Sequence, residues 1–360
     1  MIIYFLIFVT IFIFSLVASI RVPTSSSYYS SNLTVDWYFI IFILSIFIGL
    51  RHQVGGDWYI YEEQAIEILF ADSVFDYISL KGDLGYYLIS YLSAKLGAHV
   101  YLANYICALI FSFGLAVICR TTSRPILSLA AAFPYLIIVV AMGYTRQSVA
   151  IGLILIGISY LIRQKLGWFI AMIFLATLFH KTALVFLPIG IFVLSRNKFL
   201  SFGSIIIFGL VAFFVFLESY IDNLIWAYVS NDPESSGALI RLSMNIVPSV
   251  LFFIFYKRFN ISEIERKIFL VMSLISVSLF ILYFATSITT ALDRIGLYML
   301  PLQMLIFSRL PELFNDRISK TLVFSALFAY FFLVLFVWLN FATHSYLWVP
   351  YNSVLINWLN

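Results

Sequence analysis

Residues 125–162 read PILSLAAAFPYLIIVVAMGYTRQSVAIGLILIGISYLI, and this pattern indicates the fold class of the chain. Two apolar runs, 125–142 and 147–162, flank a short polar link that contains Arg146. Each run is roughly long enough for a helix to cross a hydrocarbon core of about 30 Å. Because backbone N–H and C=O groups find no water in lipid, continuous apolar runs indicate membrane-spanning helices, whereas barrel strands would show short alternating segments.

Similar apolar runs recur along the whole sequence. Hydrophobic residues make up 63% of the 360 residues and charged residues 11%, and the mean hydropathy is +1.04, whereas a soluble chain is about a quarter charged. We therefore expect an all-α, polytopic integral membrane protein, a single transmembrane domain over residues 1–360 with about twelve spans. The expected spans are 2–20, 36–50, 100–119, 125–142, 147–162, 168–180, 182–195, 200–217, 238–256, 267–286, 294–308 and 321–340.

The distribution of basic residues predicts the orientation. With both termini outside, the positive-inside rule is satisfied, because 14 of the 21 Lys and Arg residues fall in cytoplasmic loops: Arg21, Arg120, Arg124, Arg163, Lys165, Arg196, Lys198, Lys257, Arg258, Arg266, Lys267, Arg309, Arg317 and Lys320. A further apolar helix at 84–97 is expected to be re-entrant or interfacial, since a full crossing would move Arg120 and Arg124 to the other side. The sequence has no basic arm or patch, so the expected partner is the lipid bilayer and not nucleic acid.

The termini and the long loops carry further expectations. The first helix, 2–20, is expected to be retained, because a cleavable signal peptide would have basic residues before its apolar run. Residues 51–83 and 218–237 are expected to be outer loop segments of the single domain. The tail after Asn340, with Trp348 and Trp358, is expected to form an aromatic interfacial helix.

Polar residues gather at the outer ends of the expected spans. Ionisable groups in a membrane segment cost several kcal/mol, so they normally line a cavity or a site. After the second span the stretch RHQVGGDWYIY begins at Arg51, and its glycine pair, which includes Gly55, permits a turn that would aim Arg51 and Asp57 into a common space. A site and a structural ion pair are equal alternatives for these two charges. Aromatic neighbours such as Tyr61 suit sugar rings, although aromatics are also usual at membrane boundaries.

Three other groups share this location. Arg146 begins a helix, where a cation does not complement the helix dipole, so it is expected to have an anionic partner, either a carboxylate of this protein or a ligand phosphate. His180 and Lys181 interrupt a long apolar run, and a structural and a functional histidine are equal alternatives there. Asp293 and Arg294 point in different directions on a helix, so each is expected to pair elsewhere, with Arg294 as the ligand contact.

The arginines at these helix ends indicate an anionic substrate. Guanidinium forks bind phosphate oxygens in pairs and do not lose their proton. A lipid diphosphate at the membrane surface is the anion that suits such a set. The sequence has no zinc-spaced histidines, no Asp-x-Asp pair, no P-loop, no GxSxG and no dinucleotide fingerprint, so neither a metal nor a cofactor is expected.

In their order along the chain, these motifs resemble those of the EpsG family, a branch of the Wzy-type bacterial polysaccharide polymerases. An Arg-x-x-Val-Gly-x-Asp-x-x-x-Tyr element is matched by Arg51, Val54, Gly55, Asp57 and Tyr61. The family's acidic-Pro-Gly-aromatic element and its later positions are matched by Asp83-Leu84-Gly85-Tyr86, Arg146-Gln147, Phe179-His180, Arg294 and Tyr298. The chain departs from the family at Gly56, where Thr is frequent, and at Leu84, where Pro is frequent.

The resemblance implies a polymerase in the bacterial cytoplasmic membrane whose active site faces the exterior. Such an enzyme transfers a growing glycan from undecaprenyl diphosphate to the sugar of an incoming undecaprenyl-diphosphate-linked oligosaccharide, and a chain-length regulator is a further candidate partner. Asp57 or His180 would be the base, and Arg146 and Arg294 would stabilise the leaving diphosphate. The remaining expected substrate-binding residues are Arg51, Gly55, Tyr61, Gln147 and Tyr298.

Other functions remain open from the sequence. An O-antigen ligase would share the donor and the architecture, but such enzymes usually carry one large outer loop, whereas the outer segments here are 33 and 20 residues long. A glycan O-acyltransferase would use His180 as its base. A flippase or transporter would catalyse no chemistry, and its charges would be expected near the membrane midplane on broken helices.

Overall fold

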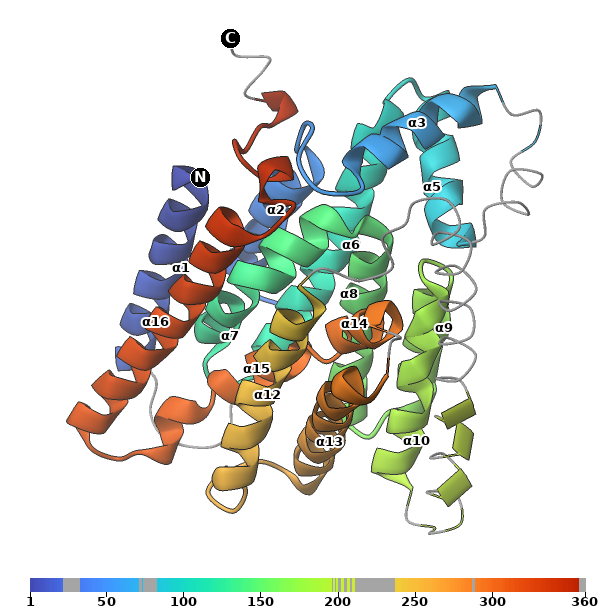
Figure 1. Cartoon of the computed structure of the whole chain (residues 1–360). Coiled ribbons are helices and arrows are strands. Elements are labelled where there is room, and N and C mark those ends of the chain that lie inside the picture. The colour runs from blue at the N-terminus through green and yellow to red at the C-terminus, as the bar shows by residue number, and fades with distance from the viewer. Residues whose placement is uncertain are drawn as a thin grey trace.

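The computed structural model describes residues 1–21, 33–70, 73, 83–195, 197, 199, 202–203, 206–207, 209–210, 237–286 and 289–355. Figure 1 shows them as a bundle of long helices, with shorter helices across one end. Within these ranges no strand occurs, and one isolated β-bridge joins Arg51 and Ser353. The expected all-α class is confirmed.

The elements follow the apolar runs of the sequence, and most end at a Gly, a Pro or a polar link. In chain order they are α1 (Ile2–Arg21), α2 (Val35–Gly49), α3 (Trp58–Leu69), α5 (Leu84–Lys95), α6 (His99–Arg120), α7 (Pro125–Ala132), η1 (Phe133–Ala141), α8 (Thr145–Ile162), α9 (Leu166–Thr177), η2 (Lys181–Phe186), α10 (Leu187–Leu194), α12 (Ala238–Ile254), α13 (Glu263–Ala285), α14 (Thr289–Leu297), α15 (Pro301–Phe307), η3 (Leu310–Leu313), α16 (Arg317–Phe341) and η4 (Ser345–Leu347).

Among the described residues, five helices are long and apolar enough to cross a membrane, namely α1, α6, α8, α13 and α16. Five shorter apolar helices accompany them: α2, α7 with η1, α9, η2 with α10, and α12. The expected count of about twelve spans is therefore not confirmed. The span expected at 294–308 is divided between α14 and α15, where Pro301 lacks the N–H that would continue the helix. The expected span at 200–217 and the expected outer segment at 218–237 lie mostly outside the described residues.

Helix α5 occupies part of the stretch expected to be re-entrant or interfacial. Its 12 residues extend about 18 Å, which is too short to cross a hydrocarbon core. It packs along α6 and beside α3 at one end of the bundle (Figure 1). A re-entrant or interfacial position for 84–97 stays a prediction.

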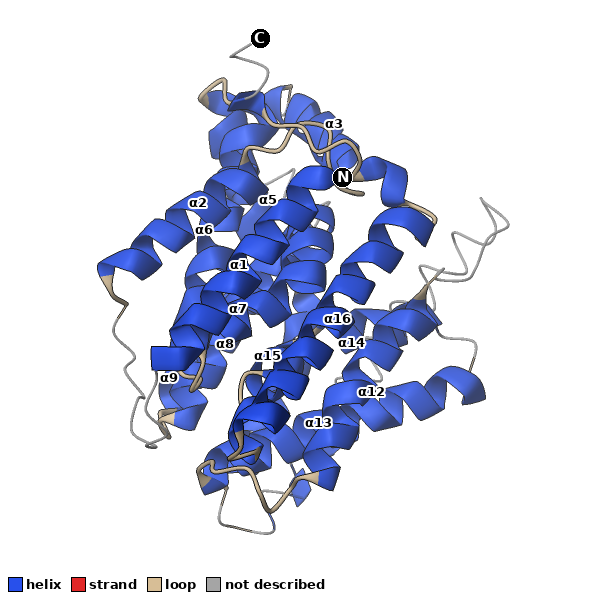
Figure 2. Cartoon of the chain, turned by 90° about the vertical axis from the view of Figure 1, so that its left-hand side faces the viewer, coloured by secondary structure: helices blue, strands red, loops and turns tan. Residues whose placement is uncertain are grey.

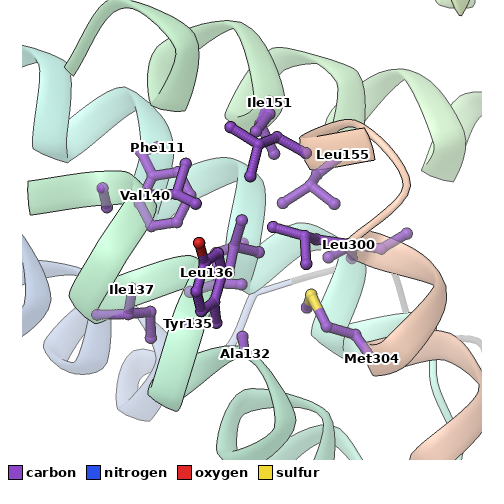
Figure 3. Close-up of a cluster of buried hydrophobic side chains, with 14 of the residues drawn as sticks. Phe111, Ala132, Tyr135, Leu136, Ile137, Val140, Ile151, Leu155, Leu300 and Met304 are labelled. Atoms are coloured by element: carbon purple, nitrogen blue, oxygen red, sulfur yellow. The ribbon is translucent and has the colours of Figure 1, made fainter. Parts of the chain in front are cut away.

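The core is built around η1, a nine-residue π-helix that continues α7 without a break. π-Helical segments are rare and often occur at functional sites. All nine residues are buried. Figure 3 shows four of them, Tyr135, Leu136, Ile137 and Val140, packed among side chains of the surrounding helices: Phe111, Ile151, Leu155, Leu300 and Met304. The same segment contributes Tyr135 to the cavity described below, so core and site share one element.

Close packing of α6 on α8 depends on two glycines. A Cβ at Gly114 would lie 2.0 Å from the carbonyl oxygen of Gly152, and a Cβ at Gly152 would lie 2.7 Å from the Cα of Phe111. Small residues let the backbones of membrane helices approach closely, which gives the packing contacts that replace a hydrophobic driving force in lipid. The two glycines therefore set how closely α8, whose first turn carries Arg146, packs on α6.

One end of the bundle carries the turns that join α2 to α3, η1 to α8 and α9 to η2, and we call it the site end. The segment after α16 returns across it. Trp348 is buried and its Nε1 donates to the carbonyl oxygen of Ile138 at 2.7 Å, while the N–H of Gly55 donates to the carbonyl oxygen of Leu347 at 2.9 Å. The single interfacial helix expected after Asn340 is therefore wrong over 342–353, where turns, the three-residue η4 and the bridge at Ser353 follow one another. Backbone bonds to residues near 50–55 hold this segment against the turn before α3. Trp358 lies outside the described residues.

The opposite end, which we call the far end, contains a buried ion pair. Arg309 Nη2 donates to Glu265 Oε1 at 2.6 Å, and the two side chains are 4% and 0% exposed. Arg309 also donates to the carbonyl oxygens of Leu305 and Thr121. Glu265 in turn accepts from Ser262 in a capping box that begins α13. These bonds connect α6, α13 and α15 at the far end.

Replacing Arg309 by methionine should lower the free energy of unfolding by about 3–5 kcal/mol, because it leaves Glu265 buried without its cation. Thermal unfolding of the purified protein in detergent measures the effect as a fall in Tm. Adding Glu265→Gln should recover part of the loss, since glutamine keeps bonds to Ser262 and carries no charge. The exposed Arg317, changed to methionine, is the control. An Arg309→Met variant as stable as this control would contradict the prediction.

Candidate functional site

A cavity of about 1160 Å³ lies at the site end. Cavities of about 300–1000 Å³ bury most of a small ligand, so this one has room for a substrate at least that large. Among the described residues, no three His, Cys, Asp or Glu side chains are grouped so that they could hold a metal ion. The cavity is lined by three carboxylates and four cations: Asp57, Asp83, Asp293, Arg146, Lys181, Arg241 and Arg294.

A chain of polar contacts crosses one wall of the cavity. The Tyr61 hydroxyl donates to Asp57 Oδ2 at 3.0 Å, and Arg146 Nε donates to the Tyr61 oxygen at 3.4 Å. Arg146 Nη1 donates to Asp83 Oδ2 at 2.8 Å and to the Tyr87 hydroxyl oxygen at 3.5 Å. The anionic partner expected for Arg146 is therefore a carboxylate of this protein. Asp83, which precedes α5, is that partner.

The turn before α3 places Asp57 on this wall. Gly55 has a φ of +103°, and a Cβ there would lie 2.0 Å from the carbonyl oxygen of Met142. Only glycine fits this left-handed conformation and this close approach. Burial raises the pKa of Asp57, and the hydrogen bond from Tyr61 and the charges of Arg146, Arg51 and Arg294 oppose that rise. Gly55 itself does not line the cavity, so its expected substrate contact is replaced by a structural role.

Arg51 does not line the cavity. Its side chain is fully buried, and it donates to the carbonyl oxygens of Val54 at 2.9 Å and Ile48 at 2.7 Å and to Thr145 Oγ1 at 2.9 Å. A cation at the C-terminus of a helix complements its dipole, so Arg51 stabilises the end of α2. The expected contact with a diphosphate is therefore replaced by a positioning role, which connects the turn that carries Asp57 to the first residue of α8.

Replacing Arg51 by methionine should lower the free energy of unfolding by about 3 kcal/mol or more, because it leaves buried acceptors without donors. The matched control is Arg294→Met, an arginine of the same site that has no described acid partner. We expect a clear fall in Tm for Arg51→Met and almost none for Arg294→Met. Equal Tm values for the two variants would contradict the positioning role of Arg51.

His180 faces the cavity from the break between α9 and η2, outside both helices. Burial, followed by the positive charges of Arg294, Arg146 and Lys181, lowers the pKa of His180 to about 3. Its Nε2 is buried and has no hydrogen-bond partner among the described residues. His180 is therefore neutral at neutral pH.

Arg294 lines the cavity from α14. Side chains of α8 and α12 hold α14 in place by donating to its carbonyl oxygens. Gln147 Nε2 donates to the carbonyl oxygen of Arg294 at 2.9 Å, and Asn245 Nδ2 donates to the carbonyl oxygen of Gly296 at 2.8 Å. Among the described residues, the guanidinium of Arg294 makes no hydrogen bond or ion pair. Arg294 is thus a cavity cation whose donors remain available for an anion.

The cavity contains a second ion pair, which the sequence did not predict. Arg241 donates to Asp293 through Nε to Oδ1 at 2.5 Å and Nη2 to Oδ2 at 2.8 Å. The expectation that Asp293 pairs elsewhere than Arg294 is confirmed, but its partner lies 52 residues away in the sequence. The available signal was Arg241 itself, an ionisable residue within an apolar helix, which is usually functional.

The structure brings six of the nine expected site residues to one cavity: Asp57, Tyr61, Arg146, Gln147, His180 and Arg294. Arg51, Gly55 and Tyr298 do not line it. Tyr298 is buried, and its hydroxyl is 2.8 Å from Thr182 Oγ1. Its expected substrate contact is therefore replaced by a contact that connects η2 to the chain after α14.

A family model described as the EpsG family matches residues 34–353 of the 360. The chain belongs to the EpsG family. The resemblance is confirmed, and the match contains the cavity and the two ion pairs that line it. No curated protein and no solved structure matches the chain. Membership of the EpsG family supports a polymerase-like function in polysaccharide biosynthesis, and in general terms a membrane glycosyltransferase.

Proposed function

We propose that this EpsG-family protein is a polymerase that transfers a growing glycan from undecaprenyl diphosphate to the sugar of an incoming lipid-linked repeat unit, on the extracytoplasmic face of the bacterial cytoplasmic membrane. The observation that carries the proposal is the placement of Asp57 and Arg294 on the same cavity. Asp57 offers a proton acceptor, and Arg294 offers a guanidinium that has no acid partner among the described residues.

Arg294 is the first candidate for the donor diphosphate. Arg146 and Arg241 already have carboxylate partners in Asp83 and Asp293, whereas Arg294 has none among the described residues. A guanidinium in a partly buried site stabilises the charge that develops on a leaving group without reorganisation. The neutral ring of His180 and the side chain of Lys181 line the same cavity and can donate to the remaining phosphate oxygens.

Asp57 is the better candidate for the base. A general base is most effective when its pKa lies near the working pH, and burial raises the pKa of Asp57 toward that range. The lowered pKa of His180, about 3, makes its ring a weak base. In the proposed step, the acceptor hydroxyl gives its proton to Asp57 and its oxygen attacks the anomeric carbon. The bond to the diphosphate oxygen breaks, its electron pair stays on the diphosphate, and the configuration inverts.

The deciding experiment uses the purified full-length protein in phospholipid vesicles, supplied with the lipid-linked repeat unit extracted from the source bacterium. Polymerisation gives a ladder of glycans that differ by one repeat unit, together with free undecaprenyl diphosphate. A ligase would move a preformed chain to a different acceptor, and an acyltransferase would add an acyl group. Movement of the lipid across the vesicle membrane with no new glycosidic bond would overturn the proposal in favour of a transporter.

A further inference from the structure

The cavity has an apolar side that the proposed chemistry does not use. Tyr330, Val334, Val337 and Phe341 follow one another at a spacing of three or four residues, so one face of α16 lines the cavity over three turns. These turns extend about 16 Å along the helix. From α12, Ile240 and Met244 line the same space. We call the space between these two faces the α12–α16 cleft.

The cleft is closed at one end and has an exposed rim. The Tyr330 hydroxyl donates to the carbonyl oxygen of Met244 at 3.4 Å. This contact between α12 and α16 closes the cleft at Tyr330. Figure 2 draws the two helices at clearly different tilts. Along the rim, the side chains of Ile240, Leu333 and Phe341 are 57%, 56% and 72% exposed. Exposed apolar side chains along a helix long and apolar enough to cross a membrane are the kind of surface that meets hydrocarbon.

The other side of the same cavity is cationic. Arg241, on α12, lies next to the apolar Ile240, and Arg294 faces the cavity from α14. A ligand that fills this space therefore needs an anion at one end and a flexible hydrocarbon chain at the other. The lipid diphosphate of the proposed function has both.

We infer that the α12–α16 cleft holds the first part of the polyprenyl chain while the diphosphate contacts Arg294. The inference rests on the proposed function and names where the lipid carrier enters the cavity. Because membrane lipid is as apolar as the cleft, the cleft adds little hydrophobic affinity. Its role is to let the diphosphate reach the cations without moving the chain into polar surroundings, where each exposed CH₂ group is unfavourable.

The test compares two diphosphates on cleft variants of the full-length protein in detergent micelles. Undecaprenyl diphosphate carries a long chain, and isopentenyl diphosphate carries the same anion on five carbons and needs no cleft. The variants Val337→Trp and Leu333→Trp fill the cleft. The matched control is Leu322→Trp, because Leu322 is an exposed residue of the same helix outside the cavity. Dissociation constants are measured by equilibrium binding of the radiolabelled diphosphates.

We expect Val337→Trp and Leu333→Trp to weaken binding of undecaprenyl diphosphate about tenfold or more. With the cleft filled, the chain lies in polar surroundings whenever the diphosphate contacts Arg294, and moving even two CH₂ groups there has that effect. Their affinity for isopentenyl diphosphate should be unchanged, and Leu322→Trp should change neither. Unchanged affinity of the cleft variants for both probes would overturn the cleft assignment alone. If the unsubstituted protein binds neither diphosphate, the proposed function and the inference fall together. Equal weakening for both probes would show damage to the anion site and would also overturn the inference.

Discussion

Replacing Arg294 by alanine should lower the rate of polymerisation about 10²–10³-fold, the usual effect of removing one preorganised group that stabilises a leaving charge. The large effect follows from its lack of a described acid partner, which leaves all its donors for the diphosphate. The rate is measured as repeat units added per minute by the purified protein in vesicles. Arg294→Lys should recover only part of the rate, because an ammonium cannot form the paired contacts of a guanidinium.

The control for this prediction is Arg317→Ala, which removes an exposed cation at the far end and should leave the rate unchanged. Tm must be the same for Arg294→Ala and the unsubstituted protein, so that the loss is not one of folding. A stable Arg294→Ala variant that still made full-length polymer at the normal rate would remove Arg294 from the reaction. It would then leave the diphosphate assignment without its principal cation.

The Asp57→Asn variant should lose about 10²–10⁴-fold in rate, the range that a general base contributes. Asparagine keeps the shape of the side chain and can still accept from Tyr61, but it cannot take the proton of the acceptor hydroxyl. His180→Ala should lose less, because the pKa of His180, lowered to about 3, makes it a weak base. A larger loss for His180→Ala than for Asp57→Asn would reverse the two roles.

The pH dependence of the rate gives an independent check on Asp57. A base must be deprotonated to act, so the rate falls as the pH drops through its pKa. Because burial raises the pKa of Asp57, this acid limb should lie above the usual carboxylate value of about 3.9. The limb should be absent from the residual activity of Asp57→Asn. An unchanged limb in that variant would assign the titration to another group.

The positions of most helices could be predicted from the apolar runs of the sequence. The conformation of some segments that join or follow these helices could not. The residues joining α2 to α3, including Gly55, were predicted to turn, and they do so with a positive φ. The segment around Trp348 was predicted to be a helix. It consists instead mostly of turns and the short η4. Its partners, such as the N–H of Gly55 and the carbonyl oxygen of Ile138, come from distant parts of the sequence, which local pattern does not report.

The sequence by itself determined that the chain is helical and apolar enough for a membrane, and that a set of ionisable groups lies at the ends of its apolar runs. Both follow from local properties, the length of apolar runs and the need to satisfy backbone groups in lipid. Only the tertiary structure decided which arginines are already neutralised. Asp83 and Arg146 are 63 residues apart, and Arg241 and Asp293 are 52 apart, so packing alone brings these charges together. That packing leaves Arg294 as the cavity arginine with no acid partner among the described residues.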